Sequence, residues 1–179
     1  MTCKLSLATL QEAAATAAIP AYDRKSLSAG IVHFGVGNFH RAHQAIYLDD
    51  LFNTGEAHDW AIIGAGVLPS DAAMREKLAA QDFLTTVVEQ DNNRTAARVT
   101  APMIDILPVG DAKTIIAKLA DPTIRIVSMT ITEGGYFIDA SGKFNPAHPA
   151  IVADGQHPDA PKTVFGLILA GLKPRRAAG

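Results

Sequence analysis

The sequence from Ile31 to His43, IVHFGVGNFHRAH, contains the pattern on which the rest of the interpretation depends. Its first four residues form an apolar run typical of a buried strand, which ends at Gly35 and Gly37. The first glycine permits a sharp turn, and the second lets a phosphate approach the backbone because no Cβ is in the way. The third glycine usual in this pattern is replaced by His40. The stretch predicts a strand, a tight turn and a helix, as in dinucleotide-binding units.

The start of the predicted helix carries positive charge where a cation is unfavourable. We expect a helix over residues 38–53 with Asn38 as its N-cap, which places His40 and Arg41 in the first turn. Cations are destabilised there by roughly 0.3–1 kcal/mol each. A bound pyrophosphate would compensate, because it accepts hydrogen bonds from the first amides and from Arg41.

Alternatives stay open for the two basic side chains. In the alternative to phosphate binding, Arg41 turns back to pair with Asp49, Asp50 or another acid, and His40 packs or forms a hydrogen bond inside the protein. The residues of this turn that we expect to bind the cofactor are Gly35, Val36, Gly37, Asn38, Phe39 and Arg41.

The rest of the chain alternates apolar runs with amphipathic segments. Residues 60–67 (WAIIGAGV) and 124–131 (IRIVSMTI) lack a two-residue alternation, which predicts strands buried on both faces of a parallel sheet. Helices are expected over 72–81, 111–120 and 162–178, a β-hairpin over 83–101, and a turn-rich insert over 134–159. This order predicts an α/β, Rossmann-type, doubly wound and mostly parallel sheet with a hairpin excursion. No strand follows the last helix, so we expect the sheet to be incomplete at the C-terminus.

Polar residues follow the second and third predicted strands. Asp71 comes just after the second strand and is our candidate for the adenosine ribose hydroxyls, although it also suits a helix cap. A carboxylate there disfavours a 2′-phosphate, which favours NAD over NADP. Thr132 and Glu133 follow the third strand, where they border the nicotinamide or simply solvate the strand end. A second Gly-x-Gly at Gly64 and Gly66 lies within the second strand and is not followed at once by a helix.

Composition restricts the possible partners. The net charge of −2 gives no field that would gather nucleic acid, and no apolar run reaches about 18 residues, so neither nucleic acid nor a membrane is expected. We predict a cytoplasmic protein with a small-molecule ligand. His33, His40 and His43 suggest a metal, but no cysteine or glutamate lies at ligand spacing, and we predict no metal site.

Four segments resemble, in order, the long-chain mannitol dehydrogenase family, which includes fructuronate and tagaturonate reductases and arabinitol dehydrogenase. They are HFGVGNFHRAHQAIYLDDL, DWAIIGAGV, IRIVSMTITEGGY and PKTVFGLILAGLKPRRAAG. The resemblance implies a metal-independent transfer of hydride between NAD and a polyol or ketose, most simply mannitol to fructose. It also implies a leader (1–29), a truncated NAD-binding domain (30–179) and a missing C-terminal domain that carries the catalytic lysine, asparagine and histidine. No catalytic residue is therefore predicted within the chain.

One departure from the family pattern and one different class of function remain. The family's acidic pair after the second strand is reduced here to Asp71, because Ser70 occupies the first position, which weakens the preference for NAD. Other members of the family remain alternatives for the substrate. The alternative class is a non-catalytic nucleotide-binding module or an inert fragment.

Overall fold

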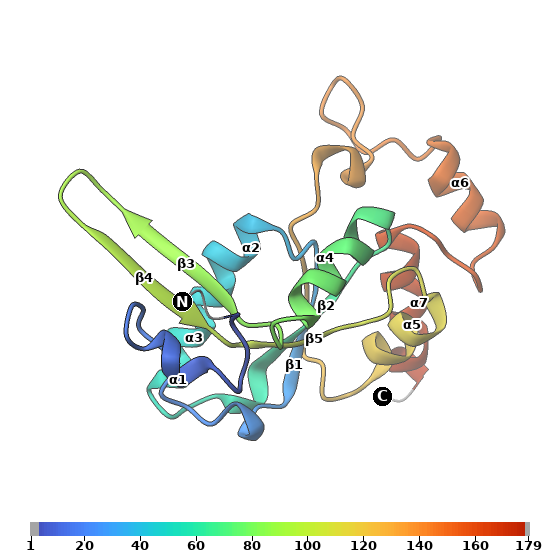
Figure 1. The fold of residues 1–179 in the computed structure, drawn as a ribbon. Coiled ribbons are helices and arrows are strands. Elements are labelled where there is room, and N and C mark those ends of the chain that lie inside the picture. Colours follow the sequence, from blue (N-terminus) through green and yellow to red (C-terminus); the bar gives the residue numbers. More distant parts are fainter. Residues whose placement is uncertain (1–3, 178–179) are drawn as a thin grey trace.

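The computed structural model, which describes residues 4–177, is built on a parallel four-stranded sheet (Figure 1). Its strands lie in the order β5-β2-β1-β6. Their bounds are Ala29–Phe34 for β1, Ala61–Ala65 for β2, Met103–Ile106 for β5 and Ile126–Met129 for β6. The chain moves from β1 to β2 and β5 on one side, then crosses to β6 on the other side of β1. The order of connections therefore reverses at β1, and open α/β sheets bind ligands at such a point, beyond the carboxyl ends of the strands.

Helices cover both faces of the sheet because its strands are apolar on both faces. Val32 and Phe34 pack in a cluster with Ile115 of α5 (Ala112–Ala120) and Leu167 of α7 (Val164–Ala177). Ile31 faces the other way, into a second cluster. That cluster includes side chains from α3 (Gln44–Asn53) and α4 (Pro69–Ala79). The doubly wound α/β prediction is confirmed.

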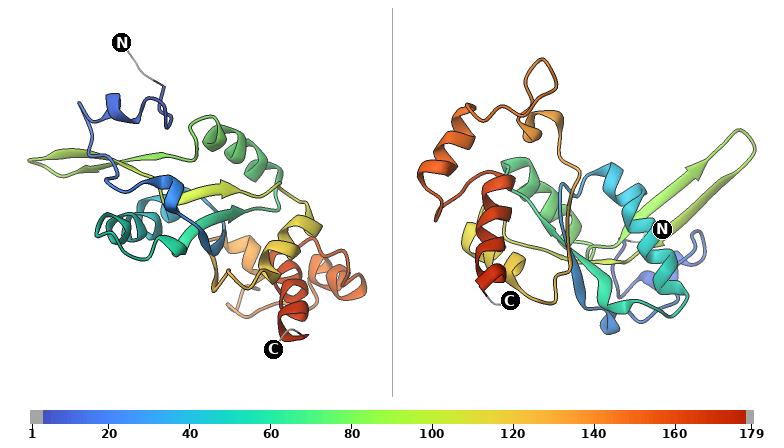
Figure 2. Two further views of the ribbon diagram at one scale, coloured as in Figure 1. Left: turned by 90° about the horizontal axis from the view of Figure 1, so that it is seen from below. Right: turned by 180° about the vertical axis from the view of Figure 1, so that it is seen from behind.

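The predicted hairpin is present and extends away from the sheet. β3 (Thr85–Gln90) and β4 (Thr95–Thr100) pair antiparallel and project from the body, as two views agree (Figures 1 and 2). The leader, which includes the short helix α1 (Leu10–Ala13), packs on the base of the hairpin, where Ala18 forms a bridge to Arg98. The hairpin and leader thus share a small apolar cluster of their own.

Several predicted elements need correction. The helix expected over 38–53 is two helices, α2 (Asn38–Ala42) and α3, separated at His43. Residues 103–106 form β5, an edge strand of the parallel sheet that was not predicted from the sequence. The segment 134–159, expected to be a turn-rich insert, also contains a helix that was not predicted, α6 (Pro149–Gln156).

The third predicted strand and the last helix also differ in detail. β6 is shorter than 124–131 and lies at the edge of the sheet, so Ile126 is 44% exposed and the strand is not buried on both faces. The helix expected to start at residue 162 starts at Val164, because Asp154 accepts hydrogen bonds from the amides just before it. Its predicted end at Ala178 lies outside the described residues.

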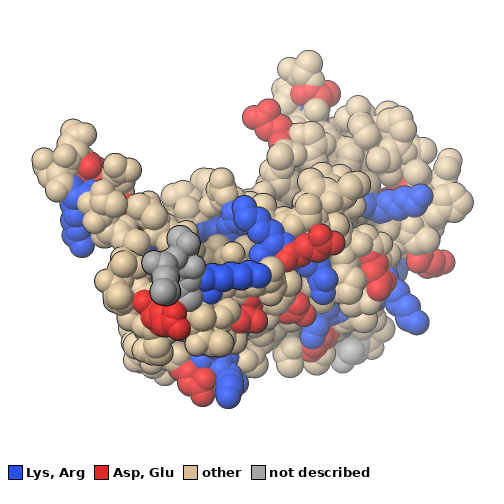
Figure 3. Space-filling view, viewed as in Figure 1, with Lys and Arg blue, Asp and Glu red and all other residues tan. Residues whose placement is uncertain are grey.

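Surface charge is mixed on the face drawn in Figure 3. Lysine and arginine side chains lie among aspartate and glutamate side chains over most of that face. No helix within residues 4–177 is long and apolar enough to cross a membrane.

Candidate functional site

The turn after β1 contains two glycines with different surroundings. Gly35 has φ +87°, and a Cβ at this position would lie 2.4 Å from the carbonyl oxygen of Thr130. Gly37 is the N-cap of α2, and a Cβ there would meet nothing within 4 Å. Gly35 is therefore required by the fold, whereas the face of Gly37 is open to an approaching group.

The start of α2 differs from the prediction. Gly37, not Asn38, is the N-cap, and no side chain caps this end. The helix leaves helical geometry at His43, whose φ and ψ are −128° and −81°. A helix of five residues has a small dipole, so the predicted penalty for cations in its first turn is small. That penalty is therefore no evidence for a bound anion.

Arg41 lies against the turn itself. One terminal nitrogen donates to the carbonyl oxygen of Val36 (3.2 Å) and contacts the sulfur of Met74 (3.0 Å), while the other donates to Oδ1 of Asn38 (2.5 Å). The predicted alternative, a return to Asp49 or Asp50, is wrong because both carboxylates pair with Arg98. Burial lowers the pKa of Arg41, and among residues 4–177 no carboxylate forms an ion pair with it.

Two of the histidines are buried directly beneath the turn. His33 and His40 stack with ring centroids 3.8 Å apart and an interplanar angle of 17°. Burial lowers the pKa of His33 to about 3 and that of His40 to about 4, so both rings are neutral at ordinary pH. His33 contacts Ser128 and Thr130, as expected of a satisfied core histidine. His40 contacts Gln44, in agreement with the packing alternative.

Asp71 lies in the first turn of α4, beyond β2, and takes part in capping that helix. Its Oδ2 accepts hydrogen bonds from the amides of Val67 and Leu68, both at 2.9 Å. A Cβ on Gly66 would lie 2.5 Å from that of Asp71, so the glycine admits this close contact. Pro69 begins the helix, which explains why it starts before the predicted residue 72. Asp71 therefore does cap a helix, but from the third position of one that begins at Pro69 and not ahead of residue 72, and the ribose contact stays a prediction.

Thr132 and Glu133 lie in the exposed segment after β6, where Thr132 precedes a short 3-10 helix. β6 pairs with β1, with Met129 opposite Phe34, so this segment and the glycine turn follow adjacent strand ends. The order β2-β1-β6 brings all three groups of predicted site residues to one edge of the sheet.

Sequence reasoning missed several residues that support the site. Gln44 and Ser128 link the buried histidines, and Met74 contacts Arg41. The signal for Ser128 was its spacing. It lies on β6 two residues before Thr130, which directly follows the strand, so both hydroxyls point the same way and can meet His33 on the neighbouring strand.

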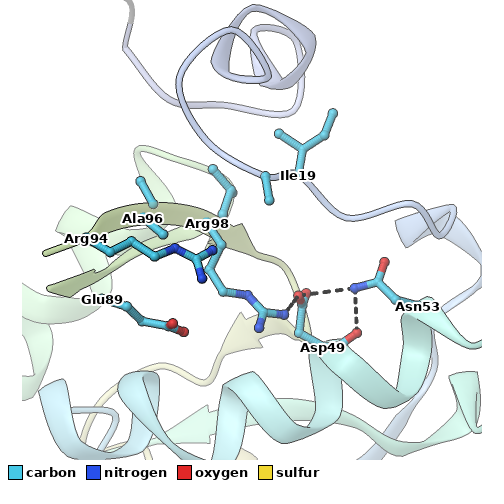
Figure 4. Close-up of a pocket in the computed structure, with 10 residues that line it drawn as sticks. Ile19, Asp49, Asn53, Glu89, Arg94, Ala96 and Arg98 are labelled. Carbon is cyan, nitrogen blue, oxygen red and sulfur yellow. Dashed lines mark hydrogen bonds and ion pairs between the residues drawn. The ribbon is translucent and has the colours of Figure 1, made fainter. Parts of the chain in front are cut away.

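One hollow of the structure lies away from the glycine turn. A cavity of about 240 Å³ opens between the leader, α3 and the hairpin, with Arg98 pointing to Asp49 and Ile19 facing them (Figure 4). Asp49 is buried and also accepts hydrogen bonds from Tyr22 (2.6 Å) and the amide of Ala101 (3.1 Å). These contacts join three parts of the fold, which assigns the cluster a structural role. Within the described part of the chain, no group of three histidine, cysteine or acidic residues could hold a metal ion.

Comparison with known proteins agrees with the geometry. A family profile described as the mannitol dehydrogenase Rossmann domain matches residues 29–179. The chain is 63% identical over 161 residues to a mannitol 2-dehydrogenase of Cereibacter sphaeroides, covering 89% of this chain and 34% of the relative. It is 43% identical to a polyol:NADP oxidoreductase of Gluconobacter oxydans, covering 96% of this chain and 36% of the relative.

Solved structures give the same result. A ternary complex of Pseudomonas fluorescens mannitol 2-dehydrogenase with NAD and D-mannitol superposes with a TM-score of 0.92 at 49% identity, covering 99% of this chain and 37% of that one. A substrate-free D-sorbitol dehydrogenase gives 0.87 at 39% identity, covering 98% and 37%. The chain thus spans about a third of the length of the relatives it matches. Taken with the glycine turn and the sheet order, these matches establish that the chain belongs to the mannitol dehydrogenase Rossmann domain family.

Proposed function

We propose that the chain is the NAD-binding part of an oxidoreductase that transfers hydride between NAD and a polyol or ketose, with mannitol and fructose as the pair. The observation that carries the proposal is the turn at Gly35–Gly37, at the point where the strand order reverses, with open space at Gly37 and Arg41 beside it. The similar mannitol 2-dehydrogenase from Pseudomonas fluorescens that binds NAD and D-mannitol supports the choice of ligands.

The turn fits a dinucleotide for two physical reasons. Its backbone at Gly37 has no side chain in the way of a phosphate, and Arg41 supplies a cation that no carboxylate among the described residues neutralises. In this proposal Val36, Asn38 and Phe39 line the turn, Asp71 binds the ribose, and Thr132 and Glu133 border the nicotinamide. NAD, when bound, supplies the hydride acceptor, and these residues hold and orient it.

The preference for NAD rests on Asp71. A carboxylate at the end of β2 would repel a 2′-phosphate, although its Oδ2 is engaged by two amides and Ser70 beside it is exposed. The Gluconobacter relative is called an NADP oxidoreductase, so both cofactors belong in the test. We expect NADH to bind more tightly than NADPH, and the reverse order would overturn the assignment of Asp71.

Calorimetry with NADH tests the proposal directly, with a matched pair of glycine variants. Gly37→Ala places a methyl group where the phosphate would approach the backbone. It should therefore weaken binding at least tenfold, which corresponds to a loss of about 1.4 kcal/mol or more. Gly155→Ala adds the same group on α6, also with nothing within 4 Å, and should bind like the wild type. No binding by the wild type, or equal binding by both variants, would refute the site.

Turnover separates the remaining alternatives. No general base or substrate contact is assigned to residues of this chain. We propose that these groups come from a further part of the protein that corresponds to the two thirds of the relatives that this chain does not match. NADH binding without oxidation of mannitol, arabinitol or other polyols by this chain is therefore expected, as for a nucleotide-binding module. Hydride transfer by a protein that adds those two thirds, assayed with mannitol, arabinitol and fructuronate, identifies the substrate. A cytoplasmic location stays a prediction.

A further inference from the structure

A continuous run of polar side chains lies beneath the glycine turn. His33, on β1, contacts Ser128 Oγ with Nδ1 (2.8 Å) and Thr130 Oγ1 with Nε2 (2.9 Å). Gln44 joins Ser128 to His40, through Nε2 at 3.3 Å and Oε1 at 3.1 Å. His33 and His40 are 0% and 1% exposed, so water does not reach their rings, while Gln44, Ser128 and Thr130 are half-buried. The hydrogen-bonding capacity of each group then fixes the direction of every bond.

The direction is set at the Thr130 end. The Thr130 hydroxyl donates its single proton to the carbonyl oxygen of Gly35 at 2.9 Å. Its oxygen can therefore only accept from His33, which places the proton of that ring on Nε2. Since a neutral imidazole carries one N–H, Nδ1 of His33 is an acceptor, and the hydroxyl of Ser128 donates to it.

The same reasoning continues to the far end. The Ser128 proton is used, so its oxygen accepts from the Gln44 amide nitrogen. Oε1 of Gln44 then faces His40 and accepts from Nδ1–H. The proton of His40 is thus on Nδ1, the opposite tautomer to His33. This leaves Nε2 of His40 as a bare acceptor, and it is buried with no partner among the described residues.

We infer that these side chains form one directional hydrogen-bond chain, from His40 through Gln44, Ser128, His33 and Thr130 to the carbonyl of Gly35, and that the two histidines are positioning residues for the turn. The inference rests on the proposed function, because the turn matters only if it binds the dinucleotide. Thr130 also donates its amide to the carbonyl oxygen of Phe34 at 2.9 Å, so it holds both peptide groups that lead into the turn. His40 occupies the position of the missing third glycine, and its ring stacks on His33.

Neutrality of both rings is part of the arrangement. A proton on His33 would turn its Nδ1 into a donor and break the bond from Ser128, whereas a proton on His40 would create a buried N–H at Nε2 with no partner among the described residues. Burial and the neighbouring ring lower the pKa of His33, and burial lowers that of His40. Neither lowered pKa depends on the cofactor, so the hydrogen-bond chain can be tested separately from cofactor binding.

Nitrogen-15 NMR of labelled histidine reads the tautomers without any ligand. We expect two of the six imidazoles to stay neutral from pH 8 to about pH 5, one protonated on Nε2 and the other on Nδ1. His33→Gln and His40→Gln assign the two signals. Ser128→Ala removes the donor to His33 and should change the ring signals of both histidines. Equal tautomers, or titration of either ring near its ordinary pKa, would overturn the chain.

Cofactor binding tests the positioning role. Thr130→Val removes the hydroxyl and should weaken NADH binding about tenfold, the effect of losing roughly one well-formed hydrogen bond. Thr130→Ser restores the hydroxyl and should bind within about threefold of the wild type. Thr86→Val, on the exposed side of the hairpin, is the matched control and should bind unchanged.

The outcomes are distinguishable. Wild-type binding by Thr130→Val, or equal losses for Thr130→Val and Thr130→Ser, would overturn the positioning role even if the tautomers are as expected. If the wild type binds no NADH, the proposed function and the positioning role both fail. The tautomers of His33 and His40 then decide by themselves whether the hydrogen-bond chain exists. If Thr130→Val does not fold, Ser128→Ala replaces it and should show the same loss of binding.

Discussion

Gly35 and Gly37 are two residues apart, yet a methyl group would have opposite consequences at the two positions. At Gly35 an alanine combines a left-handed φ with a Cβ 2.4 Å from the carbonyl oxygen of Thr130. We expect Gly35→Ala to lower the free energy of unfolding by about 2 kcal/mol or more. Gly37→Ala should leave it within about 0.5 kcal/mol, since φ is −70° and the space is open. Urea denaturation of both variants checks this, and equal destabilisation would contradict it.

The buried histidines should make stability depend on pH. Their pKa values, about 3 for His33 and about 4 for His40, lie below the ordinary 6.5, so the unfolded chain takes up protons that the folded chain does not. The stabilisation is complete above pH about 6.5 and is lost as pH falls, at up to about 1.4 kcal/mol per pH unit for each ring. Urea denaturation between pH 7 and about pH 4.5 measures the slope. His33→Gln should reduce it by about half, exposed His157→Gln should change it less, and a flat profile for the wild type would contradict the burial.

Among the elements, helix α3 is joined to the hairpin and the leader by one buried carboxylate. Asp49 accepts from Tyr22, Arg98 and the amide of Ala101. Asp49→Asn should lower the free energy of unfolding by about 3 kcal/mol, because donors and a cation lose their partner. Asp50→Asn, at a position 57% exposed that also pairs with Arg98, should cost less than about 1 kcal/mol. Equal losses in urea denaturation would show that Asp49 does not join these elements.

How far the elements could be predicted depended on the length and uniformity of their patterns. β1 and β2 are apolar runs bounded by turn residues, and the hairpin has its Asp91-Asn92-Asn93 tip, so all were predicted. β5 has only four residues and includes Asp105, so its apolar run is too short and too interrupted to be recognised as a strand. The break at His43 could not be predicted because residues 38–53 contain no glycine or proline that would signal it. The glycine turn is local and could be predicted, whereas the supporting hydroxyls of Ser128 on β6 and of Thr130 just after it could be placed only from the strand order.

Considering the chain as a unit, the leader is part of the folded body. Leu10, Ala17 and Ile19 pack on Leu84 and Val99 at the base of the hairpin. Removing residues 1–20 should uncover this cluster and lower the free energy of unfolding by about 3 kcal/mol, or roughly 6–12 °C in Tm. Thermal unfolding and binding of a hydrophobic dye check it, and an unchanged Tm would contradict it. At the other end, Leu169 and Leu172 of α7 are 64% and 49% exposed, whereas Ile168 of the same helix packs against the core cluster.

The setting of Arg41 has a kinetic consequence. Its guanidinium is held by the oxygens of Val36 and Asn38, and no acid among residues 4–177 cancels its charge. A fixed, uncompensated cation attracts a polyanion before contact is made, and dissolved ions screen that attraction over a Debye length of about 10 Å at 0.1 M. The association rate of NADH should therefore fall as ionic strength rises, and an Arg41→Gln chain should lose most of that dependence.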